Sequence, residues 1–296
     1  MSARIWALSP IFLLAMIGGY STLRAESRHA GARFERDIEY ARVNGVSLRM
    51  DASIPVGVGK FPSAIIVHGG GWVGGDREFN VQPLFQPLAD AGFAWFSISY
   101  RLATDVSQFG AGISDVQEAI RFVKAHAADY HIDPDKIALV GESAGGQLAA
   151  MAVLRGGRDT CVRAVVALYT PSDLVSLISD SAYIPASVRN SVRGMPWESL
   201  VLARLAQLSP INNVHAGMPP FLFIHGTADS LVPFAQSREM CNRMHQAGAS
   251  CELYPVEGGG HGIQWWESSP KLATAYKRKM IEWLRHELGM PTAVAS

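Results

Sequence analysis

The fold follows from the stretch Ile137-Ala-Leu-Val-Gly-Glu-Ser-Ala-Gly-Gly146, in which a buried apolar run turns directly into a helical segment. Such a sharp strand-to-helix turn forces the residue at its apex into a strained backbone conformation. Gly141 and Gly145, two positions to either side of Ser143, leave room for this turn because they carry no side chain. We therefore expect the Ser143 hydroxyl to project from the edge of a sheet, beside the backbone N–H of Ala144. The same motif also occurs as a glycine-rich turn with an incidental serine, and the strand–turn–helix context favours a nucleophile.

Strands and helices alternate along most of the chain. A half-exposed strand is predicted at 46–52, and continuous apolar runs typical of strands buried on both faces follow at 64–67, 93–96, 137–140, 164–168 and 221–224. Helical spacing is found between and after them, at 113–123, 148–154, 234–244 and 272–288. This order predicts an α/β domain, with a mainly parallel sheet covered by helices on both faces. Without a repeat or a linker to divide it, we expect one domain over residues 26–296.

The segment 171–218 departs from this alternation. It lies between two buried strands and contains prolines at 171, 185, 196 and 210. Since it is too long for a simple crossover, we predict a cap-like insertion over the carboxyl edge of the sheet.

The first 25 residues have the pattern of a secretory signal peptide. Arg4 precedes a short apolar run, and a small residue, Ala25, stands at a plausible cleavage site. The apolar run is short and broken by Ser9-Pro10, so we expect export and no stable membrane insertion of the mature chain. The alternative is an uncleaved N-terminal anchor.

A serine nucleophile needs a base and an acid. His261 is the candidate base because it lies in the flexible loop Gly258–Gly262, after an apolar strand. Asp229 follows another buried strand, so its carboxylate can fix the histidine tautomer and stabilise the imidazolium. The chain order Ser143, Asp229, His261 is that of α/β-hydrolases. Asp173 is the competing candidate for the acid.

The oxyanion of a tetrahedral intermediate needs preorganised donors. The strand at 64–67 ends in His68-Gly-Gly-Gly-Trp72, whose glycines let two backbone N–H groups turn toward the developing charge. We expect His68 to hold this loop by hydrogen bonds. Residues 69–74 also fit G-x-G-x-x-G, but Trp72 crowds the space of a pyrophosphate, so we reject a dinucleotide site. The sequence contains no P-loop motif and no metal-ligand cluster, and we expect neither cofactor nor metal.

Composition limits the partners. The 26 Lys and Arg residues balance 26 Asp and Glu residues, and 48% of the chain is apolar. Without a basic surface for a phosphate backbone, we expect no nucleic-acid partner. The three cysteines are too few for a disulfide scaffold. Cys241 and Cys251 are the pair that export would allow to form a disulfide, although two buried free thiols are the outcome that we favour.

Six motifs together resemble α/β-hydrolase carboxylesterases, above all the hormone-sensitive-lipase-like esterases and the bacterial acetyl and feruloyl esterases. They are His68-Gly-Gly-Gly-Trp72, Tyr100-Arg-Leu102, Gly141-Glu-Ser-Ala-Gly-Gly146, Ser209-Pro210, His225-Gly-Thr-Ala-Asp229 and Gly260-His-Gly262. The resemblance implies an α/β-hydrolase fold with an eight-stranded sheet. It also implies that Ser143 is the nucleophile, His261 the base and Asp229 the acid.

The same resemblance implies that Gly70, Gly71 and Ala144 donate to the oxyanion. One departure is that Trp72 follows the glycines directly, so its N–H could share this role. Formamidases that act on formyl-kynurenine look similar around the glycine loop, which keeps amide-type substrates open.

The expected activity is hydrolysis of short-chain acyl esters by a two-step acyl transfer. The substrate would be a small molecule or a saccharide ester, and acetylated or feruloylated saccharides follow from family analogy alone. A serine peptidase of the oligopeptidase type is an alternative, but such chains usually carry a propeller domain, which this sequence lacks. A non-catalytic binding protein on the same fold is a further alternative, and it would normally have lost a triad residue.

Overall fold

The computed structural model describes residues 31–104, 108–180, 194–196 and 198–291. The predicted signal peptide over 1–25 lies outside the described residues, as does part of the predicted insertion. Within the described ranges, no helix combines the length and the apolar character needed to cross a membrane.

Eight strands form one sheet in the order β1-β2-β4-β3-β5-β6-β7-β8. Their bounds are β1 Ala32–Val43, β2 Val46–Pro55, β3 Phe61–Val67, β4 Ala94–Ile98, β5 Ile132–Glu142, β6 Ala164–Leu168, β7 Phe221–Gly226 and β8 Cys251–Val256. The β1–β2 and β2–β4 pairs are antiparallel, and the remaining pairs are parallel. The prediction of a mainly parallel, eight-stranded α/β-hydrolase sheet is therefore confirmed.

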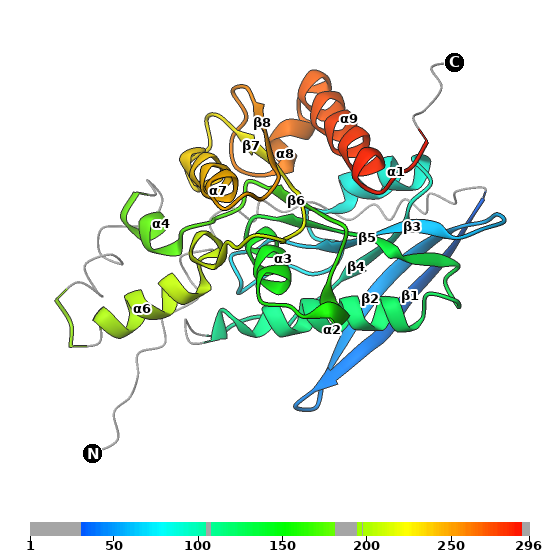
Figure 1. The fold of residues 1–296 in the computed structure, drawn as a ribbon, viewed down its shortest axis with the longest axis horizontal. Coiled ribbons are helices and arrows are strands. Elements are labelled where there is room, and N and C mark those ends of the chain that lie inside the picture. The colour runs from blue at the N-terminus through cyan, green and yellow to red at the C-terminus, as the bar shows by residue number, and fades with distance from the viewer. Residues whose placement is uncertain (1–30, 105–107, 181–193, 197, 292–296) are drawn as a thin grey trace.

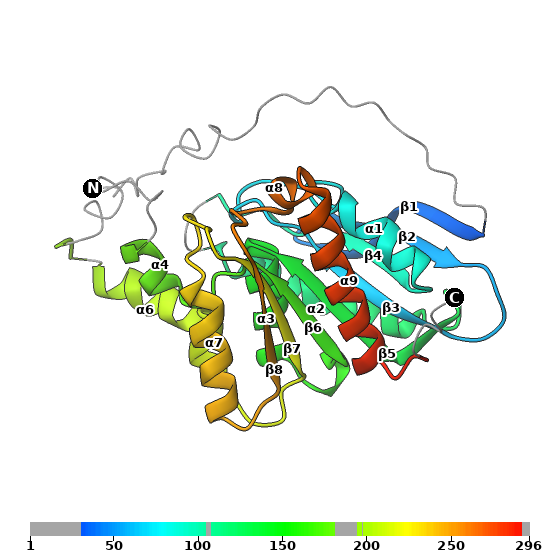
Figure 2. The ribbon, with the colours of Figure 1, turned by 90° about the horizontal axis from the view of Figure 1, so that it is seen from above.

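Helices cover both faces of this sheet, as Figures 1 and 2 show. One face packs against α2 (Ala111–Ala125), α3 (Ala144–Leu154) and α7 (Ala235–Gln246), and the other against α1 (Gln82–Asp90), α8 (Ile263–Glu267) and α9 (Pro270–Glu287). Neighbouring residues of β3 explain the two layers, because Ile65 belongs to the first core and Ile66 to the second, both without exposed surface. A strand that is apolar at every position is buried on both sides.

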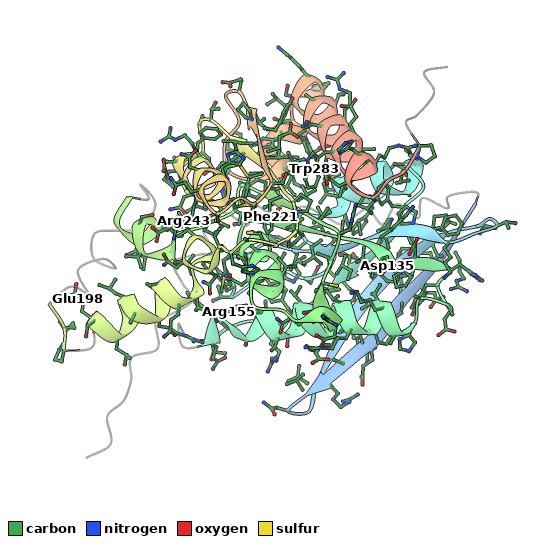
Figure 3. The ribbon with its side chains drawn as sticks, viewed as in Figure 1. Asp135, Arg155, Glu198, Phe221, Arg243 and Trp283 are labelled. Atoms are coloured by element: carbon green, nitrogen blue, oxygen red, sulfur yellow. A yellow bond between two sulfur atoms is a disulfide. The ribbon has the colours of Figure 1, made fainter. Side chains whose placement is uncertain are left out.

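The layers meet in a core that is filled by large side chains. Phe221 on β7 lies in the middle of the molecule and Trp283 lies on the sheet-facing side of α9, whereas Glu198 marks the outer end of α6 (Glu198–Leu208) (Figure 3). Full burial of an aromatic side chain contributes roughly 2–3 kcal/mol from the hydrophobic effect. The two cores hold the strand ends in place, and those ends carry the residues with predicted chemical roles.

The segment between β6 and β7 contains α4 (Leu174–Asp180), α6 (Glu198–Leu208) and the 3-10 turn η5 (Pro210–Asn213), and α4 and α6 extend away from the sheet in Figure 1. Ser209 joins these pieces: its hydroxyl accepts a hydrogen bond from Leu174 N at 2.9 Å and donates to Leu205 O at 2.8 Å. This region lies within the predicted cap-like insertion at 171–218, whose function as a cap stays a prediction.

Cys241 and Cys251 form a disulfide between α7 and β8, with their Cα atoms 5.4 Å apart. The expectation of two free thiols is therefore wrong. Cys241 is buried against the sheet, and β8 runs beside it as the edge strand. The third cysteine, Cys161, is free and exposed.

Thiol titration tests this pairing. We expect the denatured, unreduced protein to react at one thiol, Cys161, and the reduced protein to react at all three cysteines. Reduction should also lower the free energy of unfolding by about 2–3 kcal/mol, because the bond no longer restricts the unfolded chain. A Cys161→Ser variant, with no reactive thiol before reduction, is the control. Three reactive thiols in the unreduced protein would contradict the disulfide.

Candidate active site

Ser143 stands between β5 and α3 with φ of 49° and ψ of −121°, a conformation that costs energy for a residue with a side chain. The residues two positions to either side of Ser143 are glycines because a side chain at either position would clash. A Cβ at Gly145 would collide with the carbonyl oxygens of Val67 and His68, and a Cβ at Gly141 would press on the first turn of α3. The helix can thus start directly after the strand, and its first turn lies against the end of β3.

The structure brings Ser143, His261 and Asp229 together from the ends of β5, β8 and β7. Ser143 Oγ lies 3.0 Å from His261 Nε2, and His261 Nδ1 lies 2.8 Å from Asp229 Oδ2. In this arrangement Nδ1 carries the proton donated to the carboxylate, which leaves Nε2 free to accept the serine proton. The three side chains therefore have the geometry of a nucleophile, a base and the residue that orients the base.

The carboxylate of Asp229 accepts three hydrogen bonds and has a fourth polar group close by. Its Oδ1 accepts hydrogen bonds from the backbone N–H groups of Leu231 and Val232, at 3.0 and 2.8 Å. Its Oδ2 accepts from His261 and lies 3.3 Å from Nε2 of the fully buried His225. Burial alone would raise the pKa of Asp229, but the hydrogen bonds from His225 and His261 outweigh it and lower the pKa to about 2. The group is therefore ionised at neutral pH.

The competing acid has a different place. Asp173 Oδ1 accepts hydrogen bonds from the N–H groups of Val175 and Ser176, at the start of α4. Its own N–H and that of Ser172 donate to the side chain of Gln236. Asp173 therefore serves the insertion and has no contact with His261 among the described interactions.

The glycine loop after β3 has three successive residues with positive φ: Gly70 at 114°, Gly71 at 59° and Trp72 at 66°. Gly69 N donates to Glu142 Oε1 at 2.9 Å. Within the part of the chain that the structure describes, the N–H groups of Gly70 and Gly71 have no acceptor, nor does that of Ala144 at the start of α3. These three predicted oxyanion donors are free to bind a ligand oxygen.

The side chain of Trp72 contacts α3, the helix that follows Ser143. Its Nε1 donates to Gln147 Oε1 at 2.9 Å, and its ring stacks on Phe109 with centroids 4.9 Å apart. Gln147 Nε2 donates in turn to Leu208 O, at the end of α6. These contacts connect the glycine loop, α3 and the insertion. The sequence patterns did not single out Gln147.

His68 is fully buried and stacks on Tyr100, with ring centroids 4.3 Å apart. Its Nδ1 donates to the carbonyl of Gly69 at 2.6 Å. Burial lowers the pKa of His68 to about 4, so the ring is neutral at physiological pH. The geometry is that of a residue that shapes the glycine loop.

The contact of His225 with Asp229 was not predicted from the sequence, where His225 stands only as the first residue of the motif that ends in Asp229. The spacing of four residues between the two was visible in the sequence, but only the turn after β7 brings the ring against the carboxylate. The ring is fixed by Ser237 Oγ, 2.6 Å from Nδ1, and by Val232 O, 2.8 Å from Nε2.

Comparison with known proteins agrees with this arrangement. Residues 50–244 match the BD-FAE family. The chain is 31% identical over 229 residues to LipM of Mycobacterium tuberculosis, a probable carboxylic ester hydrolase, and the match covers 73% of this chain and 52% of LipM. The chain spans about half the length of the curated relatives that it matches.

Solved structures of esterases superimpose on nearly the whole chain. Esterase 2 of Thermogutta terrifontis with bound propionate has a TM-score of 0.72 and 27% identity, and covers 90% of this chain and 97% of that one. The same esterase has been solved with butyrate and phosphorylated by paraoxon. A carbohydrate esterase from gut microbiota has a TM-score of 0.71 and 26% identity, and covers 88% of this chain and 97% of that one.

Replacement of Asp229 by Asn tests the charge that the site holds. We expect the free energy of unfolding at neutral pH to fall by about 2 kcal/mol, since one pKa unit corresponds to about 1.4 kcal/mol. Because the pKa is about 2 in the folded protein and 3.8 ordinarily, this contribution is present above pH 3.8 and is lost as the pH falls toward 2. Urea unfolding of both proteins at a series of pH values measures it. A difference that stays constant or widens in acid would contradict the expectation.

Proposed function

The chain belongs to the BD-FAE family of α/β-hydrolase esterases, and we propose that it is a carboxylesterase that hydrolyses short-chain acyl esters through Ser143, His261 and Asp229. The proposal rests on two hydrogen bonds: one joins Ser143 Oγ to His261 Nε2 (3.0 Å), and the other joins His261 Nδ1 to Asp229 Oδ2 (2.8 Å). A serine is a weak nucleophile unless a base takes its proton, and here the base is in place and oriented.

The first step forms an acyl-enzyme. Ser143 Oγ attacks the ester carbonyl carbon while its proton passes to His261 Nε2, and the carbonyl oxygen gains the negative charge. The free N–H groups of Gly70, Gly71 and Ala144 bind this oxyanion. His261 then gives the proton to the departing alcohol as the bond from carbon to the alcohol oxygen breaks.

The second step repeats the chemistry with water. His261 takes a proton from the water as its oxygen attacks the acyl carbon, and the proton returns to Ser143 Oγ as the acid leaves. Asp229 stays ionised throughout, because two backbone N–H groups and His261 donate to it and His225 lies close by, and it stabilises the imidazolium at each stage. This cycle consumes one water and needs no redox partner.

The acyl group in our proposal is short, and the alcohol is a small molecule or a saccharide. Thermogutta terrifontis esterase 2, which has been solved with propionate and butyrate, supports a short acyl chain. The carbohydrate esterase from gut microbiota supports a saccharide ester, and the acetyl or feruloyl group follows from family analogy alone. Phosphorylation of esterase 2 by paraoxon is the reaction expected of an activated nucleophile.

Export completes the proposal. The signal-peptide pattern over 1–25 and the Cys241–Cys251 disulfide both favour an oxidising compartment. Mass spectrometry of the protein recovered outside the cytoplasm should find Glu26 at the N-terminus. Full-length protein retained with membranes would favour the N-terminal anchor instead.

Hydrolysis of p-nitrophenyl esters with two to twelve acyl carbons tests the activity. We expect acetate and butyrate to be the best substrates, and Ser143→Ala to lower kcat by about 10⁴-fold or more, because the acyl-enzyme cannot form. The exposed Ser268, which follows α8 and donates to Trp265 O in that helix, provides the control: Ser268→Ala should retain wild-type activity.

Three outcomes would count against this proposal. Lack of activity on every chain length would contradict an esterase and direct the search to formyl-amide and peptide substrates. A preference for long acyl chains would contradict the substrate class. Activity that survives Ser143→Ala would contradict the mechanism.

A further inference from the structure

We propose that Glu142 and Tyr169 are positioning residues. Through one buried chain of hydrogen bonds, they hold the glycine loop after β3 and the segment around His261 against the turn that carries Ser143. The inference rests on the proposed esterase function. Neither residue touches the reacting atoms. Both are almost completely buried, in the layer directly beneath Ser143 and His261.

The chain of hydrogen bonds crosses four strand ends. Gly69 N, in the glycine loop after β3, donates to Glu142 Oε1 at 2.9 Å. Tyr169, just after β6, donates its hydroxyl to Glu142 Oε2 and accepts a hydrogen bond from Ile263 N at 3.2 Å. Ile263 lies two residues after His261. Two loops that are far apart in the sequence are thereby tied to the residue before the nucleophile.

The carboxyl group of Glu142 suits this position because both of its oxygens accept. Burial raises its pKa, and the hydrogen bonds from Tyr169 and Gly69 act in the opposite direction. Burial also raises the pKa of Tyr169 well above its ordinary value, so the phenol keeps its proton and remains the donor. A side chain with only one acceptor could not bind both the loop and the phenol.

The ring of Tyr169 adds a second support. It meets His261 edge-on, with centroids 4.8 Å apart at 70°, and meets Trp266 at 5.2 Å and 88°. The backbone of Tyr169 has φ of 37°, although tyrosine rarely adopts a positive φ. Its N–H is bound to Ile224 O at 2.9 Å. The strained backbone places the ring under the histidine and the hydroxyl beside Glu142.

The reaction depends on this placement because oxyanion donors act only at close range. A donor must lie about 2.7–3.1 Å from the oxyanion, and a displacement of about 1 Å can cost 10²-fold in rate. The N–H of Gly69 belongs to the His68–Gly69 peptide, which directly precedes the peptide that carries the N–H of Gly70, so its bond to Glu142 restrains how the following N–H groups point. Loss of the chain should therefore lower kcat while KM changes little, since the donors act on charge that develops in the transition state.

The test compares four variants on the best p-nitrophenyl ester. We expect Tyr169→Phe, which keeps the ring and removes the hydroxyl, to lower kcat about tenfold, and Glu142→Ala about 100-fold, with KM within about twofold. Glu142→Gln should recover part of the loss, because its amide oxygen can still accept from Gly69. The matched control is Tyr276→Phe: Tyr276 is also a buried tyrosine that donates to a glutamate, Glu267 Oε1 at 2.7 Å, but it lies on α9.

Amide hydrogen exchange provides a readout that does not need turnover. Exchange at Gly69 and Ile263 should accelerate at least about tenfold in Glu142→Ala and in Tyr169→Phe, respectively, and remain slow in Tyr276→Phe. Lack of activity on every ester would contradict the proposed function, whereas the exchange rates would still test the positioning role of Glu142 and Tyr169. The two proposals can therefore be refuted independently.

The inference is overturned if kcat stays at the wild-type value in Tyr169→Phe and Glu142→Ala, or if Tyr276→Phe lowers kcat as much as Tyr169→Phe does. It is also overturned if KM rises and kcat does not fall, or if exchange at Gly69 and Ile263 is unchanged. If Glu142→Ala fails to fold, the kcat and exchange rates of Tyr169→Phe provide the test, because this variant retains the packed ring and loses only the hydroxyl.

Discussion

The first turn of α3 lies so close to the end of β3 that no side chain fits between them, and the rest of the site depends on this contact. Gly145 faces the carbonyl oxygens of Val67 and His68, and a Cβ there would collide with both. Since the helix starts at this point, Ser143 has to take up its strained conformation at the apex. A Cβ at Gly69 would lie 3.2 Å from Ser143 Cβ, so the glycine loop also lies directly against Ser143. One close approach thus brings together the proposed nucleophile and the proposed oxyanion donors.

Burial of charge shapes the other half of the site. A carboxylate out of water is costly unless donors surround it, and Asp229 has two backbone N–H groups and two histidines around it. His225 is fully buried and is itself held by Ser237 and Val232 O. The orientation of His261 is therefore set by a small polar cluster between β7 and α7. The Cys241–Cys251 disulfide joins α7 to β8, the strand that leads to the histidine loop.

The fold and the candidate triad could be predicted from the sequence because they depend on local patterns. Apolar runs of strand length predicted the buried strands, and the order of Ser143, Asp229 and His261 indicated which loops meet. The disulfide was predicted wrongly, because it depends on how α7 is set against β8 and no local pattern records that. Half of the residues of strand β1 are exposed and only one is buried, so its apolar signal is weak. The partners of Glu142 lie 73 and 27 residues away, so only the folded chain brings them together.

Backbone strain is concentrated where the chemistry is. Seven described residues other than glycine have a positive φ, and four of them are of types that tolerate this conformation: Asp37, Asn44, Asn80 and His131. The other three are Trp72, Ser143 and Tyr169, and all three border the candidate site. Each would cost roughly 1–3 kcal/mol if its surroundings did not fix it. Gln147 binds the indole of Trp72, Leu168 O accepts from Ser143 N, and Glu142 binds the hydroxyl of Tyr169. Hydrogen bonds in a buried, closely packed layer can hold such conformations, because an unpaired polar group there would cost about 1–3 kcal/mol, which is as much as the strain. The buried polar groups around the candidate site therefore allow a mainly apolar core to hold Ser143, His261 and the N–H groups of the glycine loop in the positions that the proposed mechanism needs.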